Sequence, residues 1–323
     1  AMTQNNLGNA YSNRIRGDRA ENLERAIAAY EAALQVRTRE AFPQQWAGIQ
    51  NNLGLAYSDR IRGDRAENLE RAIGAYEAAL QVRTREAFPQ DWAMTQTNLG
   101  TAYKNRIQGD RAENLERAIA AYEAALQVYT REAFPQDWAM TQNNLAGAWL
   151  QRSELGGDLA ERDRAIELLQ EVLPVSIPGT QTFLSGSYTL GNALFRRYEQ
   201  NNDRADLEAA VQAYEAAFHS LSPEHYSLPL VSRKLGEAES VVGALLVNEG
   251  KWHQGLEFLR SSLGKLQKSD DLLAHANALY QTGRANELLN NLTTARTYYR
   301  DALRLYEHLD HTEGIAQTRA GLG

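Results

Sequence analysis

The stretch NNLGNAYSNRIRGDRAENLERAI, which runs from Asn5 to Ile27, decides the fold because the chain repeats it. NNLGLAYSDRIRGDRAENLERAI begins at Asn51, and TNLGTAYKNRIQGDRAENLERAI begins at Thr97. Three blocks of 46 residues align without a gap, and 36 of the 46 positions are identical in all of them: 1–46, 47–92 and 93–138. A fixed period of this length indicates a repeat protein, in which each unit buries its apolar face only by stacking on its neighbours.

Each block predicts two helices joined by a turn. In the first block we expect a helix over 2–15, because Leu7, Tyr11 and Ile15 fall on one side of it. The letters RGD that follow supply a turn with a glycine. The third block has QGD at the same place, so the motif indicates a turn and not a cell-adhesion signal.

The second helix of each block begins directly after this turn. Asp18 and Glu21 have the spacing of a capping box, and Asn22 is an alternative cap. The apolar positions that follow recur at helical spacing and include one tyrosine in each block. We therefore expect three tyrosines to be buried between helices: Tyr30, Tyr76 and Tyr122.

The pattern Leu7-Gly8-x-x-Tyr11, followed by Ala26-x-x-x-Tyr30-x-x-Ala33, resembles the tetratricopeptide repeat, or TPR. The long period and the NNLG opening are closer to the kinesin-light-chain-like variety. ENLERAIAAYEAAL and REAFPQ also resemble repeats of cyanobacterial proteins that carry a CHAT-type protease domain. The resemblance implies an all-α fold, a right-handed α-solenoid of antiparallel helix pairs (TPR superhelix), with the first helices on its concave face.

The repeats continue less evenly to the end of the chain. LGNALFRRYEQNNDRADLEAAVQAYEAAF, from Leu190, and TGRANELLNNLTTARTYYRDAL, from Thr282, keep the small and aromatic positions of the pattern. We expect the chain to be a piece of a longer protein with these divisions: three near-identical repeats over 1–138, a degenerate fourth over 139–178, a fifth over 179–224, a sixth over 225–271, a seventh over 272–311, and the first helix of a truncated eighth over 312–323.

Composition narrows the possible functions. The net charge is −7 and no basic block stands out, so nucleic acid is not an expected partner. Without cysteine there are no disulfides or thiolate metal sites, and no apolar run is long enough for a membrane span. No Ser-His-Asp order, phosphate loop or paired carboxylates can be assembled, so we expect no catalytic residues, no metal site and no cofactor, and a cytoplasmic location.

Ten positions differ among the three blocks, in first-block numbering 2, 3, 5, 9, 12, 13, 16, 28, 37 and 45. Positions 2, 5, 9, 12 and 16 form one stripe of an α-helix, which the TPR resemblance places toward the concave groove. Recent duplication with free drift is the alternative explanation. The invariant Asn6, Asn52, Asn98 and Asn144 are more readily explained by hydrogen bonds between repeats than by ligand contacts.

The changing surface predicts a site that is rich in amides and hydroxyls, which can pair with peptide groups whatever their side chains. The aromatic side chains of the fifth repeat, Tyr188 and Phe195, indicate an apolar pocket there, or else belong to the core. The predicted partner-binding residues are Asn5, Asn9, Asn13, Asn51, Leu55, Asp59, Thr97, Thr101, Lys104, Asn105, Asn143, Tyr188 and Asn192.

The sequence therefore predicts a non-catalytic module that binds a protein or peptide through its concave groove. The resemblance implies a sensor or recruitment region of a larger protein, with a CHAT-type protease as one effector. The alternative is a structural spacer or a self-assembling scaffold. Because both ends lack a neighbouring unit, weak head-to-tail self-association is also expected.

Overall fold

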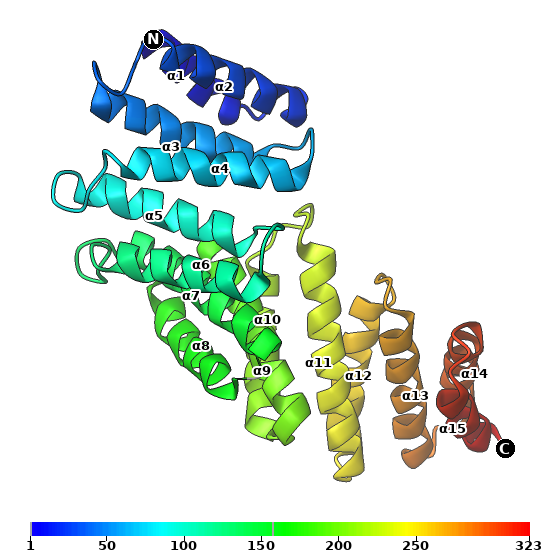
Figure 1. Cartoon of the computed structure of the whole chain (residues 1–323). Coiled ribbons are helices and arrows are strands. Elements are labelled where there is room, and N and C mark those ends of the chain that lie inside the picture. The colour runs from blue at the N-terminus through cyan, green and yellow to red at the C-terminus, as the bar shows by residue number, and fades with distance from the viewer. Residues whose placement is uncertain (1, 157) are drawn as a thin grey trace. The chain divides into compact units, whose positions relative to one another are not determined.

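The computed structural model describes residues 2–156 and 158–323, and these form α-helices and one short 3-10 helix without any strand. The predicted all-α solenoid class is confirmed, because the helices follow one another as antiparallel pairs. The chain divides into two compact units, residues 1–175 and residues 176–323, and each is described by itself. In Figure 1 the first unit is coloured from blue to green and the second from green to red.

The described residues of the first unit form four helix pairs. Their first helices alternate with their second helices along the chain, and a 3-10 helix follows the last pair. The bounds are α1 (Met2–Ser12), α2 (Arg19–Leu34), α3 (Pro43–Asp59), α4 (Arg65–Leu80), α5 (Pro89–Lys104), α6 (Arg111–Leu126), α7 (Pro135–Gly156), α8 (Leu159–Val172) and η1 (Leu173–Val175).

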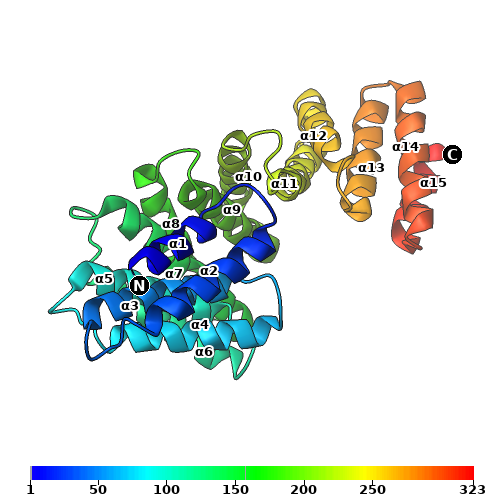
Figure 2. The same ribbon diagram turned by 90° about the horizontal axis from the view of Figure 1, so that it is seen from above.

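The second unit contains three helix pairs and one further helix. The helices α12, α13 and α14 follow one another as a row in both views (Figures 1 and 2). The bounds are α9 (Gln181–Asn201), α10 (Arg204–His219), α11 (Leu228–Asn248), α12 (Trp252–Leu266), α13 (Leu272–Leu288), α14 (Leu292–His308) and α15 (Thr312–Leu322).

Helix starts follow the sequence signals closely. Asp18, Asp64 and Asp110 cap the second helices, and Asp18 Oδ1 accepts a 2.6 Å bond from the backbone N–H of Glu21. This bond satisfies one of the free donors at the helix N-terminus. The turn before it needs Gly17, whose φ of +86° lies in the left-handed region.

Two details of the sequence prediction were wrong. The first helix ends at Ser12, so Ile15 lies in the connecting loop and is 98% exposed, not packed beside Leu7. Asn22 is not a cap. Its side chain is buried and donates a 3.0 Å bond to the backbone carbonyl of Arg16, which closes the loop from inside. The loop therefore leaves the helix early because a buried amide holds its backbone.

The core of each near-identical repeat is built around one tyrosine. Tyr30, Tyr76 and Tyr122 are almost completely buried, which confirms the prediction. In each repeat the ring packs against a glycine of the first helix, so closely that a Cβ on Gly8 would lie 2.5 Å from Cε1 of Tyr30. The glycine is therefore required where the two helices of a pair approach.

The first helices form the inner row of the first unit. Helix α1 contacts α3, α3 contacts α5, and α5 contacts α7, whereas no comparable contact joins consecutive second helices within the described part of this unit. Because consecutive first helices lie closer together than consecutive second helices, the stack of helix pairs bends toward the first helices. The exposed surface of the first helices is therefore the concave one, as the resemblance implied.

Candidate functional site

The predicted site residues at repeat position 5 lie between neighbouring first helices. Asn51, Thr97 and Asn143 are buried. Asn51 Oδ1 accepts a 3.2 Å bond from Asn98 Nδ2, and the hydroxyls of Thr97 and Thr141 are 3.2 Å apart. Asn51 and Thr97 therefore join one repeat to the next, and a partner on the concave surface would not reach any of the three without displacing neighbouring groups.

Two of the four invariant asparagines at position 6 make the expected bonds between repeats. Asn52 Nδ2 lies 3.2 Å from Asn9 Oδ1 and 3.4 Å from Asn5 Oδ1, and Asn98 makes the equivalent bond to Asn51. This interpretation of Asn52 and Asn98 is confirmed. In both cases the amide meets a polar side chain of the preceding repeat, which favours asparagine at this position.

Position 9 lies beside the buried tyrosine of the same repeat. The hydroxyl of Tyr30 donates a 2.8 Å bond to Asn9 Oδ1, and the Tyr122 hydroxyl lies 3.1 Å from Thr101 Oγ1. In the second repeat Leu55 stands at this position, 43% exposed, and offers no polar atom. Position 9 therefore changes the surface from polar to apolar and back over three repeats.

Four predicted residues are exposed on or at the ends of first helices, and with the half-buried Lys104 they make a set of five. We call this set the first-helix surface. Leu55, Asp59 and Asn105 are exposed, Asn13 is exposed directly after α1, and Lys104 is half-buried at the end of α5.

The first-helix surface carries two charged residues, and only one of them has a partner of opposite charge in the described part of the chain. Asp59 lies 3.5 Å from Arg19, but Lys104 has no carboxylate partner among the described residues. Burial, and then the positive charge of Arg111, lowers the pKa of the Lys104 ammonium. The equivalent of position 9 in the next repeat is Gly147, where a Cβ would lie 3.8 Å from Lys104 Nζ. The ammonium therefore occupies space that a missing side chain leaves open, with another cation nearby.

Tyr188 and Asn192 belong to α9 in the second unit. The hydroxyl of Tyr214 donates a 2.8 Å bond to Asn192 Oδ1, which repeats the arrangement of Tyr30 and Asn9. Tyr188 packs at a ring distance of 6.1 Å from Tyr214 and is partly buried against a small apolar cluster. Its contribution to a binding surface stays a prediction.

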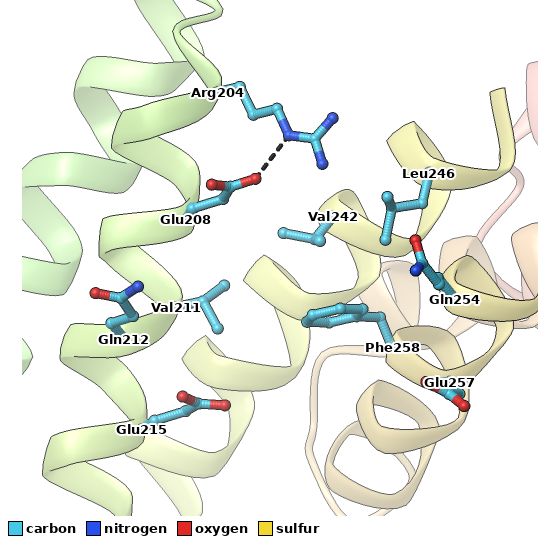
Figure 3. A pocket seen from close by; sticks show the side chains of 10 residues that line it. All are labelled: Arg204, Glu208, Val211, Gln212, Glu215, Val242, Leu246, Gln254, Glu257 and Phe258. Carbon is cyan, nitrogen blue, oxygen red and sulfur yellow. Dashed lines mark hydrogen bonds and ion pairs between the residues drawn. The ribbon is translucent and has the colours of Figure 1, made fainter. Parts of the chain in front are cut away.

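A groove between α10 and α12 was missed by the sequence reasoning. It has a volume of about 540 Å³ and an apolar floor formed by Val211, Val242 and Phe258 (Figure 3). At one end Arg204 Nε donates a 2.7 Å bond to Glu208, and at the other Glu215 and Glu257 extend from the two helices. Helical spacing alone gave no signal for it, because the groove depends on how far two second helices diverge.

Other kinds of site are not evident in the described residues. No group of three or more histidine or acidic side chains within 2–156 and 158–323 is arranged to hold a metal ion. None of the described helices is both long and apolar enough to cross a membrane.

Comparison with known sequences gives one family. The model of the tetratricopeptide repeat family matches residues 1–39, 46–86 and 92–131. No curated protein matches the chain.

Several solved structures are similar to this chain at low sequence identity. The apo form of RapI is similar over 96% of this chain and 98% of its own, with 14% identity and a TM-score of 0.55. A tetratricopeptide repeat protein from Parabacteroides merdae is similar over 99% of this chain and 100% of its own, with 14% identity and a TM-score of 0.46. The apo form of the quorum sensor NprR from B. thuringiensis is similar over 88% of this chain and 72% of its own, with 15% identity and a TM-score of 0.46.

Proposed function

The chain carries tetratricopeptide repeats, and on that premise we propose that it is a non-catalytic module that binds a protein or peptide through the first-helix surface. The observation that carries the proposal is Lys104, an ammonium partly withdrawn from water, with a cationic neighbour and no carboxylate partner among the described residues. Such a charge is costly until an acidic group meets it. A partner segment with an aspartate or glutamate opposite Lys104 would supply that group.

Other residues of the first-helix surface fit an extended or helical peptide. Leu55 offers an apolar contact, and Asn105 offers both hydrogen-bond donors and an acceptor. A single neutral hydrogen bond contributes only about 0.5–1.5 kcal/mol, and one to a charged group about 1.5–3 kcal/mol. The acidic contact at Lys104 would therefore supply much of the specificity. The polar side chains of the first-helix surface would fix the register of the bound peptide.

Site-specific photo-crosslinking tests this proposal. A photoreactive amino acid is placed at Leu55, on the first-helix surface, and in a control at Gly74, which is exposed on the second helix α4. Exposed to lysate of the source cells, the Leu55 probe should yield discrete crosslinked partners that disappear in the Lys104→Glu background. Equal labelling from both positions would contradict the assignment of the surface.

The alternative function is a spacer or a scaffold that stacks end to end. It predicts that crosslinks from Leu55 are absent, and that the main species in solution grows with protein concentration. The two functions are therefore separated by the same preparation, examined by crosslinking and by light scattering.

The finer proposal is that this module is the recruitment or sensor region of a larger cytoplasmic protein, with a CHAT-type protease as its effector. The support is the resemblance of ENLERAIAAYEAAL and REAFPQ to repeats of such proteins. Reading the complete coding sequence tests it, and a full-length protein without an effector domain would contradict it.

A further inference from the structure

A pocket of about 260 Å³ lies between the first and second repeats. All of its lining residues except Asn52 occupy positions that change among the three near-identical blocks. Position 37 is among them, and it lies beyond the end of the second helix, not on that helix. Half of the ten changing positions thus meet in one place, which free drift over an exposed surface does not explain.

The pocket is open because the second repeat has a glycine where the others have methionine. Gly48 corresponds to Met2, Met94 and Met140. A Cβ on Gly48 would lie 3.5 Å from Arg83 Nη2, an ordinary contact, so a longer side chain would extend over the guanidinium. The exchange to glycine therefore leaves space beside the Arg83 guanidinium, which lines the pocket.

Arg83 is a buried cation whose donors are not all used. Its residue exposure is 7%, and Nη1 donates a 3.0 Å bond to Thr95 Oγ1. Its closest carboxylate is Asp91, at 3.5 Å from Nη2, and Nε has no hydrogen-bond partner. Burial lowers the pKa of this guanidinium, which agrees with a charge that is incompletely compensated.

A second arginine lines the same pocket with less compensation. Arg37 stacks on Phe42, with its guanidinium carbon 4.1 Å from the ring centre. The residue that corresponds to Asp91 is Gln45 in this repeat, so no carboxylate stands beside Arg37 at that position. Two guanidinium groups therefore face a pocket for which the repeats supply one carboxylate.

We propose that this pocket binds the carboxylate of an aspartate or glutamate side chain from a partner polypeptide. The proposal rests on the function proposed above, and it adds a second acidic contact to the one at Lys104. A guanidinium fork matches a carboxylate in shape and charge. The side-chain amides of Asn5 and Gln45 supply further donors. Since pockets for drug-sized ligands measure about 300–1,000 Å³, this one is suited to a single side chain.

The pocket can be tested without knowing the natural partner. The probe is the peptide Ac-Gly-Glu-Gly-NH2, added to the full chain with selectively 15N-labelled arginine, at constant ionic strength. The Arg83 Nε–Hε resonance, assigned by its loss in Arg83→Lys, should shift and saturate. The isosteric Gln peptide should bind about tenfold or more weakly, because 1.4 kcal/mol of charge-assisted bonding is lost.

Two variants keep the test specific. Gly48→Met restores the residue of the other repeats and should fold normally, yet it should abolish the shift. Gln45→Asp places a carboxylate beside Arg37 and should weaken binding.

An unchanged response in Gly48→Met, or equal binding of the Gln peptide, would overturn the proposal. Tighter binding of a phosphoserine peptide would also overturn it in favour of a phosphate site. None of these results alters the crosslinks expected from Leu55, so failure of the pocket and failure of the proposed function are distinguishable.

Discussion

Gly54 of α3 and Tyr76 of α4 fit together so closely that a Cβ on the glycine would lie 2.7 Å from Cε1 of the ring. The same pairing joins Gly8 to Tyr30 and Gly100 to Tyr122. Two letters far apart in each repeat therefore form one structural unit, because a side chain on the glycine would overlap the tyrosine ring. Its stability can be measured directly.

Truncation of the tyrosine should be strongly destabilising. We expect Tyr76→Ala to lower the free energy of unfolding by about 3–5 kcal/mol, because a large buried ring leaves a cavity. Tyr226→Ala is the control, since this side chain is 81% exposed and its loss should cost less than about 0.5 kcal/mol. Urea unfolding followed by circular dichroism measures both. A Tyr76→Ala midpoint equal to wild type would refute the packing described.

The effect of Gly54→Ala should change sign with its neighbour. In the wild-type background overpacking costs about 1–3 kcal/mol and outweighs the gain of about 1 kcal/mol in helix propensity. With Tyr76→Leu, the added methyl group has space and Gly54→Ala should stabilise. The fourth repeat carries this combination, with Ala146 and Leu169 both buried. A double-mutant cycle without coupling would mean that the two residues act independently.

Alkaline pH should unfold the protein through its buried tyrosines. Burial raises the pKa of Tyr30 to about 12 and also raises the pKa values of Tyr76 and Tyr122. Because these folded pKa values exceed the unfolded value of about 10, the stabilisation is complete below pH 10 and is lost as the pH rises toward 12. Each such tyrosine contributes a slope of about −1.4 kcal/mol per pH unit.

Tyr76→Phe isolates one of these contributions. Denaturant titrations between pH 9 and about 11.5 should show a shallower loss of stability in the variant than in the wild type, by the slope of one tyrosine. Parallel curves would show that Tyr76 ionises as readily in the folded state as in the unfolded one.

A clamp between repeats should be measurable as a coupling energy. Arg106 Nε and Nη2 donate bonds of 2.7 and 2.8 Å to the two carboxylate oxygens of Glu70, and Arg60 binds Glu24 in the same way. Half-exposed pairs are screened, but bidentate geometry strengthens them. We expect a coupling of about 1 kcal/mol for Arg106 and Glu70, reduced by added salt. Zero coupling at low salt would contradict this contribution.

Self-association tests the scaffold alternative. Leu7 of α1 is 42% exposed, whereas the equivalent Leu53 of α3 is only 7% exposed because a preceding repeat covers it. We expect weak end-to-end association, seen as an apparent mass that rises over about two decades of concentration. A constant monomer mass would remove this expectation and weaken the scaffold alternative.

The sequence predicted the helix pairs and their tyrosine cores because both follow from local spacing and from a repeat whose copies are nearly identical. It did not predict the loop that begins after Ser12, since the determinant is a single hydrogen bond from Asn22 to the carbonyl of Arg16. Periodicity also placed position 5 on the changing stripe, but could not show that Asn51 and Thr97 are covered by the next first helix. The pocket at Arg83 depends on residues from two repeats, which spacing within one repeat cannot bring together.

The affinity of a crosslinked partner for Lys104→Gln tests the central claim most directly. Once a partner segment has been identified, its dissociation constant should rise about tenfold or more in this variant, because a charge-assisted bond is lost. The charge-matched Lys268→Gln, which changes an exposed lysine after α12, should bind like the wild type. Equal affinity of all three proteins would contradict the claim that the partner meets the first-helix surface.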